Sequence, residues 1–462
     1  MSHKAPHYDV PTTDFDVLGE QIEEAMTRLH VPGVAVGLWH QGQRYTAGYG
    51  VTNINHPLPV DGETLFQIGS ITKTVTATAA MRLVEQGKLD LDATVRTYLP
   101  DFVLSDENVA AQVTVRHLFT HTGGWLGDYF VDLGMGDDAL AKTVESMVDL
   151  PQLTAPGEIW HYNNAGFYVA GRIMEVITGK PYEIALRELL LEPLGMDHSF
   201  FMPGEVMIHR FTVGHIIDGE QISVAEPWGM ARAVNPVGGL NSCAKDMLRY
   251  AQFHLGDGTG PDGTPLLSKA NLEFMRSTLT EVGHAADAVG VSWMLKRYGD
   301  VLLVSHGGAT NGQQATFVFA PDRDFALVVM TNSSRGSELH REIRDWTLDR
   351  YLGITKANPN IQAIAESALA EYVGDYQATL DRYEIRLEDG ELILQERPQG
   401  GFPDKSSEPG PTPPPARIGF VAEDRIVGLD GRIKGLPGEF LRDQAGKIVW
   451  FRFGSRIHAR QD

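Results

Sequence analysis

The sequence lacks several features that mark common classes of protein. Its single cysteine, Cys243, excludes an internal disulfide. No apolar run is long enough to span a membrane, so we expect no membrane partner. The first residues, MSHKAPHYDVPTTDF, contain no apolar segment of the kind that a signal peptide needs. We therefore predict a cytoplasmic protein.

Positive charge is also scarce. The 39 lysines and arginines are outnumbered by 60 acidic residues, which gives a formal net charge of -21. Because a phosphate backbone is bound by a basic surface, we expect no nucleic-acid partner. The 16 histidines show no zinc-like spacing, and the nearest pair, His117 and His121, has no carboxylate motif beside it. We predict neither a metal nor a cofactor.

The 462 residues are too many for one ordinary domain. Strand-like runs near both ends of residues 10–355 enclose a helical middle, which predicts an α/β domain with one mostly antiparallel sheet. Residues 356–462 contain short strand-like pieces and a proline-rich loop, SSEPGPTPPPA. They predict a small all-β, barrel-like (lipocalin-like) domain, in which the sequence shows no chemistry.

The stretch from Leu65 to Gly87 organises the first domain. It predicts a loop that turns into a helix, with Ser70 at the helix start and Lys73 one turn further on. Residues three apart share one face of a helix, so the amine of Lys73 can reach the Ser70 hydroxyl. The helix is apolar nearly all round, which predicts burial and a lowered lysine pKa. A serine beside such a base is an activated nucleophile, although a serine at this position is more often only a cap.

Two further motifs are weak when taken alone. Tyr162 and Asn164 lie in a loop just before a helix, where core packing and a helix cap explain them equally well. His306, with two glycines after it, ends a predicted strand, as many turns do. Their order along the chain, after Ser70 and Lys73, is more informative than either motif.

Taken together, the three motifs resemble those of the serine β-lactamase and penicillin-binding-protein superfamily. The similarity is closer to the class C-related branch, which includes CubicO-type peptidases, D-aminopeptidases and family VIII esterases. The similarity covers residues 15–350 and includes the segments FQIGSITK at 66–73, LFTHTGG at 118–124 and HGGATNG at 306–312. The resemblance implies a β-lactamase/transpeptidase-like α/β fold, with an antiparallel sheet flanked by helices and an all-helical lobe.

The resemblance also implies roles for individual residues. Ser70 is then the acylated nucleophile. Lys73 and Tyr162 share the general acid and base work, with the phenol hydrogen-bonded to both Ser70 and Lys73. Asn164 positions the substrate and the Lys73 amine.

The third motif departs from the usual Lys-Thr-Gly of β-lactamases. His306 is mostly neutral at pH 7, whereas a lysine offers a fixed charge to a substrate carboxylate. The site is therefore less suited to penicillins than to esters, amides or N-terminal D-residues. By resemblance, the backbone amides of Ser70 and Ala309 bind the oxyanion, and Gly308 with its neighbouring glycine allows close approach to the strand.

We therefore predict a serine hydrolase, a peptidase or carboxylesterase that acts on a small-molecule or peptide substrate. An acyltransferase, peptide cyclase or thioesterase of the same fold, a class C-like β-lactamase, and a catalytically retired binding protein are the alternatives. Candidate wall residues lie in two irregular stretches, 126–136 and 202–236: Tyr129, Phe130, Trp228 and Met230. The C-terminal domain either covers the pocket or mediates assembly, for example into a homo-oligomer.

Overall fold

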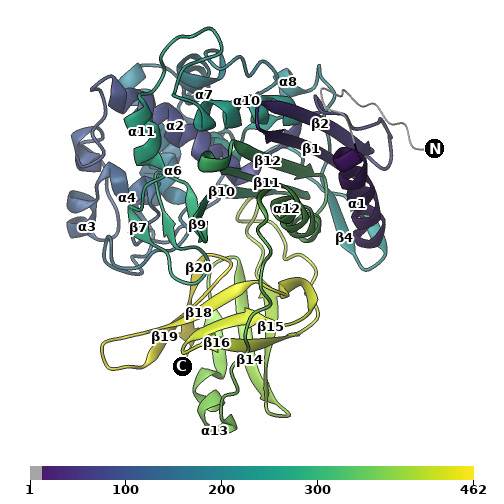
Figure 1. Ribbon diagram of the computed structural model, residues 1–462. Coiled ribbons are helices and arrows are strands. Elements are labelled where there is room, and N and C mark those ends of the chain that lie inside the picture. The colour runs from purple at the N-terminus through teal and green to yellow at the C-terminus, as the bar shows by residue number, and fades with distance from the viewer. Residues whose placement is uncertain (1–12, 462) are drawn as a thin grey trace.

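A computed structural model describes residues 13–461, which form an α/β part followed by a β-barrel (Figure 1). The predicted start of the first domain, at residue 10, lies outside the described residues. Within residues 13–461, no helix combines the length and the apolar character needed to cross a membrane.

The α/β part is built on one antiparallel sheet of eight strands, in the order β2-β1-β12-β11-β10-β9-β8-β7. These strands are β1 (Gly33–His40), β2 (Gln43–Gly50), β7 (Thr280–Glu281), β8 (Ala288–Val289), β9 (Met294–Tyr298), β10 (Val301–Thr310), β11 (Gln313–Ala320) and β12 (Phe325–Thr331). Strands from the two ends of this part meet in the sheet, because β1 pairs with β12 along its length. This arrangement confirms the predicted antiparallel sheet.

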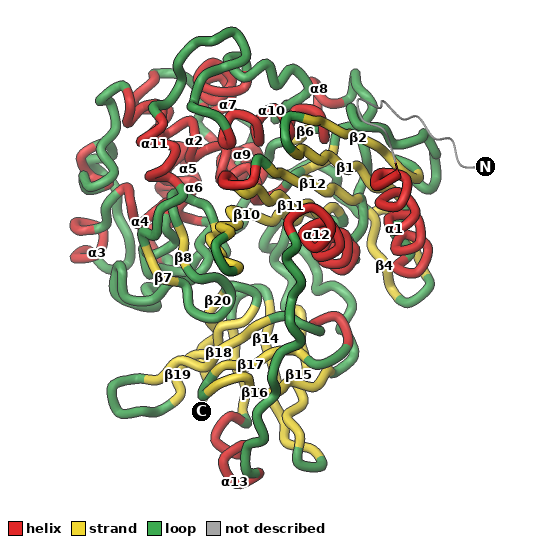
Figure 2. Tube along the Cα trace, viewed as in Figure 1, coloured by secondary structure: helices red, strands yellow, loops and turns green. Residues whose placement is uncertain are grey.

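Helices cover both faces of the sheet and form a lobe beside it (Figure 2). They are α1 (Thr13–Leu29), α2 (Thr72–Glu85), α3 (Glu107–Gln112), α4 (Val115–Phe119), α5 (Ala139–Glu145), α6 (Ala165–Thr178), α7 (Tyr182–Leu186), α8 (Pro203–Val206), α9 (Asn235–Gly238), α10 (Ala244–Leu255), α11 (Lys269–Met275) and α12 (Gly336–Leu352). The remaining strands form two small pairs: β3 (Phe66–Gln67) with β6 (Asn241–Ser242), and β4 (His215–Asp218) with β5 (Gln221–Val224).

The two faces of strand β1 pack against different helices. Val36 contributes to an apolar cluster with Leu18 of α1 and Ile343 of α12. On the other face, α10 lies so close that a Cβ added to Gly37 would be 3.0 Å from Leu248 Cγ. Because both faces are covered, the strand is apolar along most of its length rather than alternating.

The C-terminal part is a closed barrel of eight strands, which confirms the predicted barrel-like fold. Its strands are β13 (Gly374–Gln377), β14 (Asp381–Glu388), β15 (Glu391–Pro398), β16 (Ala416–Ala422), β17 (Arg425–Gly428), β18 (Pro437–Arg442), β19 (Ile448–Phe453) and β20 (Arg456–Gln461). Pairing of β13 with β20 closes the barrel. Its interior is aromatic, with Phe440 and Phe451 stacked at 4.8 Å.

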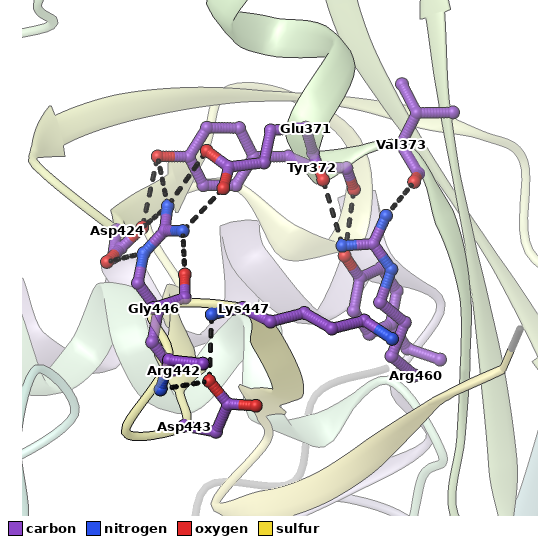
Figure 3. A network of polar contacts seen from close by, with 11 residues as sticks. Glu371, Tyr372, Val373, Asp424, Arg442, Asp443, Gly446, Lys447 and Arg460 are labelled. Atoms are coloured by element: carbon purple, nitrogen blue, oxygen red, sulfur yellow. Dashed lines mark hydrogen bonds and ion pairs between the residues drawn. The ribbon is translucent and has the colours of Figure 1, made fainter.

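Arginines tie the segment before the barrel to its strands (Figure 3). This segment contains α13 (Glu366–Leu369) and the turn that follows it. Arg442 donates to the Glu371 carboxylate and, at 2.9 Å, to Asp424. Arg460 of β20 donates to the backbone carbonyls of Glu371 and Val373, each at 3.0 Å. These contacts hold the chain segment that leads into the barrel. Its helix α13 lies at the end of the barrel away from the α/β part (Figure 1).

Several local predictions differ from the structure. From the sequence we expect Ser242 to cap the helix that follows it. Helix α10 instead begins after Cys243, which is its N-cap and makes no side-chain cap bond, while Ser242 lies in β6 and bonds the Ser199 hydroxyl at 2.8 Å. The stretch 202–236 was expected to be irregular, but it contains helix α8 and the β4–β5 hairpin. The sequence pattern also did not indicate strands β13, β17 and β20.

Candidate active site

The serine and lysine of the first motif meet as their spacing predicts. Ser70 is half-buried in a short 3-10 turn, Gly69–Ile71, that leads directly into α2. Lys73, in the first turn of α2, donates from Nζ to Ser70 Oγ at 3.0 Å and to the Val237 carbonyl at 2.8 Å. The amine and the hydroxyl are therefore in direct contact.

The surroundings of Lys73 favour its neutral form. Its side chain is fully buried, and α2 is buried nearly all round, as predicted. Its Nζ lies 5.0 Å from the centre of the Tyr162 ring and 5.5 Å from that of Phe167. Burial lowers the pKa of Lys73 well below its ordinary value; the Arg456 charge lowers it further, while Asp128 opposes that change. An amine in this state is a base that can take a proton at neutral pH.

Tyr162 lies in the loop before α6 and is 9% exposed. Burial raises the pKa of its phenol well above the ordinary value, and the nearby Ser70 hydroxyl offsets part of this rise. Among the described residues, however, its oxygen has no hydrogen-bond partner. The predicted hydrogen bonds from the phenol to Ser70 and Lys73 are therefore not formed in this structure.

Asn164 is buried directly before α6, and its side chain is held by a residue that the sequence motifs did not include. Its Nδ2 donates to Asp128 Oδ1 at 2.7 Å. Asp128 is also bound by Arg456 of strand β20, whose Nε and Nη2 lie 2.7 and 3.0 Å from its two oxygens. Burial alone would raise the pKa of the Asp128 carboxyl, but the Arg456 charge and the hydrogen bonds from Arg456 and Asn164 together lower it, so this carboxylate is ionised.

Arg456 brings the C-terminal domain to the candidate site, although the sequence indicates no chemistry in that domain. Its guanidinium carbon lies 5.1 Å from the centre of the Tyr162 ring. No sequence signal marks this residue, because β20 is not predicted and Arg456 lies 328 positions from Asp128. The barrel therefore adds a charged side chain beside the residues of the second motif.

A second residue beside the site is His121, which the sequence indicates only through its spacing from His117 and its place in the segment LFTHTGG. Its ring stacks on that of Tyr162, with centroids 4.4 Å apart. The Asn163 amide donates to its Nδ1 at 3.0 Å, whereas its Nε2 has no partner in the described part of the chain. Burial, followed by the Lys73 charge, lowers the pKa of His121 well below the ordinary value, so the ring is neutral.

The third motif lies on β10, beside the serine turn. Within the described residues, β9 pairs with β10 only as far as Ser305, so residues 306–310 pair with β11 alone. A Cβ added to Gly308 would lie 1.9 Å from the Ile68 carbonyl and 3.0 Å from the Ser70 nitrogen. A Cβ added to Gly69 would lie 2.5 Å from the Ala309 nitrogen. Both glycines thus allow the serine turn and the strand to approach closely.

His306 is buried beside Tyr162, with ring centroids 6.0 Å apart. Its Nδ1 donates to the Gly307 carbonyl at 2.6 Å, and its Nε2 has no partner among residues 13–461. Burial and then the Lys73 charge lower the pKa of His306 to about 4. At neutral pH the ring is therefore uncharged, as the sequence suggested.

The candidate wall residues make packing contacts. Phe130 packs edge-on against Phe402 of the loop between β15 and β16, with centroids 5.0 Å apart. Trp228 donates to the Thr212 carbonyl at 2.9 Å, and the Tyr129 hydroxyl bonds Ser146. Met230 packs on the main core.

The described residues contain no group of three or more histidine, cysteine or acidic side chains that could hold a metal ion.

This fold and site define a known class of protein. Residues 18–351 match the family described as Beta-lactamase, and the chain belongs to that family. Penicillin-binding protein 4 of Amycolatopsis lactamdurans is 35% identical over 336 residues, which cover 70% of this chain and 88% of that protein. A beta-lactamase of Yersinia enterocolitica is 25% identical over 347 residues, 69% of this chain and 86% of that one.

Solved structures share the whole fold. SurE has a TM-score of 0.74 and 24% identity, and the match covers 96% of this chain and 98% of SurE. An octameric penicillin-binding protein homologue from Pyrococcus abyssi has a TM-score of 0.66 and 24% identity, with 97% and 100% covered. Both likenesses therefore include the barrel as well as the α/β part. Membership of the family implies serine hydrolase or acyl-transfer activity at the general level, while the class C-related branch stays a prediction.

Proposed function

We propose that this protein is a serine hydrolase that cleaves ester or amide bonds through an acyl-enzyme on Ser70. One observation carries the proposal: the fully buried Lys73 amine lies 3.0 Å from the Ser70 hydroxyl. A neutral amine at that distance can take the hydroxyl proton as the oxygen attacks a carbonyl carbon.

The remaining roles follow from the same geometry. Tyr162, whose ring centre lies 5.0 Å from the Lys73 amine, passes the proton on to the leaving group. The backbone amides of Ser70 and Ala309 stabilise the oxyanion, since the glycines bring β10 against the serine turn. Asn164, fixed through Asp128, binds the polar part of the substrate beside the reacting carbonyl. Water then releases the acyl group from Ser70.

The charges at the site favour a substrate without a carboxylate next to the reacting bond. Lys73 and His306 are both shifted towards their neutral forms. The charge of Arg456 is balanced by Asp128 in a two-point ion pair. Neutral esters and amides therefore suit this site better than penicillins, whose carboxylate needs a cationic partner.

Intact-mass spectrometry tests this proposal. The protein would be incubated separately with p-nitrophenyl esters, D-aminoacyl amides and a penicillin, and Ser70→Ala would serve as the matched control. We expect ester or amide turnover, or an acyl adduct, in the wild type only, and an unchanged fold in the variant because loss of one half-buried hydroxyl costs little stability. Full activity of Ser70→Ala would refute the mechanism.

The same experiment separates the alternatives. An adduct that resists water but is released by an added amine indicates an acyltransferase or a peptide cyclase. Faster acylation by the penicillin than by the esters indicates a β-lactamase. Absence of both adduct and turnover with every compound indicates a binding protein or an enzyme that needs a carrier-bound substrate.

A further inference from the structure

The hairpin formed by β19 and β20 brings the barrel to the residues of the second motif. Figure 1 shows β20 at the end of the barrel that faces β9 and β10. At the turn of the hairpin, the Ser455 carbonyl accepts a hydrogen bond from the Tyr162 amide at 2.8 Å. Arg452 of β19 donates to the Trp160 carbonyl at 2.6 Å. The hairpin therefore holds the backbone of the loop that carries Tyr162.

Arg456, the first residue of β20, reaches further into the site than the rest of the hairpin. It binds both oxygens of Asp128, and Asp128 in turn accepts the Asn164 amide. Its guanidinium also lies against the Tyr162 ring. The Asp128 side chain is 6% exposed and that of Arg456 is 27% exposed, so the pair borders the site rather than the outer surface.

We propose that Arg456 is a positioning residue of the active site: through Asp128 it fixes Asn164, and its guanidinium places a charge beside the Tyr162 ring. This inference rests on the proposed function of Ser70 and Lys73. It makes the barrel a part of the active site rather than a separate module.

The two members of the ion pair act on Lys73 in opposite directions. The Arg456 charge favours the neutral amine, whereas the Asp128 charge favours the ammonium, and the effect of Arg456 is the larger. The other titratable groups that face Lys73 are His121, His306 and Tyr162. Both histidines have lowered pKa values and the phenol has a raised one, so all three stay neutral between the ordinary histidine pKa of about 6.5 and the ordinary tyrosine pKa of about 10.

Because the two charges act in opposite directions, removal of each should shift the pH profile of activity in opposite directions. If Lys73 must be neutral to act as the base, the acid limb of the pH profile of kcat/KM reports its pKa. Arg456→Met removes the lowering charge, so the limb moves to higher pH by about half a unit or more. Asp128→Asn removes the raising charge while its amide oxygen can still accept from Asn164, so the limb moves to lower pH.

The measurement uses p-nitrophenyl acetate hydrolysis by the full chain over this pH range. Arg456→Met is also expected to lower kcat about tenfold, because Asn164 loses its fixed partner. Arg456→Lys keeps the charge but not the two-point geometry, so it retains the wild-type limb and still loses kcat. Arg460→Met is the matched control. Within residues 13–461, this arginine of the same strand donates hydrogen bonds to the backbone carbonyls of Glu371 and Val373 (Figure 3), far from Asp128, so its loss should leave the limb and kcat unchanged.

The outcomes separate the two proposals. If hydrolysis does not depend on Ser70, the proposed function fails. If hydrolysis depends on Ser70 but the Arg456→Met and Asp128→Asn limbs coincide with that of the wild type, or move the same way, only this inference is overturned. If Arg456→Met does not fold, the downward shift in Asp128→Asn and the unchanged limb in Arg456→Lys still decide the matter.

Discussion

Gly308 offers a sharp test of how the strand and the serine turn cooperate. A methyl group at this position would lie 1.9 Å from the Ile68 carbonyl oxygen and 3.0 Å from the Ser70 nitrogen. Both atoms belong to the backbone, so no side chain can rotate away. The strand and the turn must part by about 1 Å or more to restore ordinary contact. Gly308→Ala therefore moves the Ser70 and Ala309 amides apart.

The expected loss can be estimated from the role of those amides. Removal of one oxyanion donor costs about 10²- to 10³-fold in kcat, and a displacement of about 1 Å in a reacting group costs about 10²-fold. We expect Gly308→Ala to lose at least about 10²-fold in kcat/KM on a p-nitrophenyl ester. Overpacking should also lower the free energy of unfolding by about 1–3 kcal/mol, so thermal unfolding must first show that the variant is folded at the assay temperature.

The adjacent glycine provides the matched control. A Cβ added to Gly307 would have the Ala315 carbonyl as its nearest neighbour, at an ordinary 3.8 Å. Gly307→Ala is therefore expected to lose less than about threefold in kcat/KM, which is about 0.7 kcal/mol. A folded Gly308→Ala with wild-type kcat/KM would refute the reasoning, as would equal losses in both variants.

Two further predictions concern the buried histidines. His306→Lys places a potential cation in the third motif and should raise penicillin turnover relative to ester turnover; an unchanged ratio of the two kcat/KM values would count against the charge argument. Acid should weaken the fold between about pH 6.5 and 4, because buried His161 and His306 have pKa values lowered to about 4 and the unfolded chain binds more protons there. The free energy of unfolding from urea titrations should fall by about 1–2 kcal/mol per such histidine from pH 7 to 5, and equal values at both pH values would contradict this.

The fold could be predicted well where short-range patterns determine it. The strand-like runs GVAVGLWH at 33–40 and QRYTAGYG at 43–50 coincide with β1 and β2, because apolar and alternating patterns are visible within eight residues. Ser70 and Lys73 could be paired for the same reason, since a separation of three residues fixes their relation within one helix. Tyr162 and His306 lie far away in the chain, so only the resemblance to a known family connected them with Ser70.

The parts of the site that were missed depend on contacts between distant segments. Strand β20, RIHARQ, has polar residues at Arg456, His458 and Arg460, so its pattern resembles that of an exposed segment. Only closure of the barrel, through pairing with β13, shows it to be a strand. Asp128 lies in an irregular loop, and nothing near it in the sequence indicates that Arg456 is its partner.

The ion pair between Asp128 and Arg456 is better explained by its effect on the site than by attachment of the barrel. A buried ion pair contributes little net stability, because desolvation of both charges offsets their attraction. The barrel hairpin is already attached by the hydrogen bond from the Tyr162 amide to the Ser455 carbonyl and by the contact of Arg452 with Trp160. An apolar pair would dock the barrel equally well, but it could neither hold the Asn164 amide nor act on the charge of Lys73. The presence of two opposite charges at this point of contact therefore favours a role in the chemistry of the site.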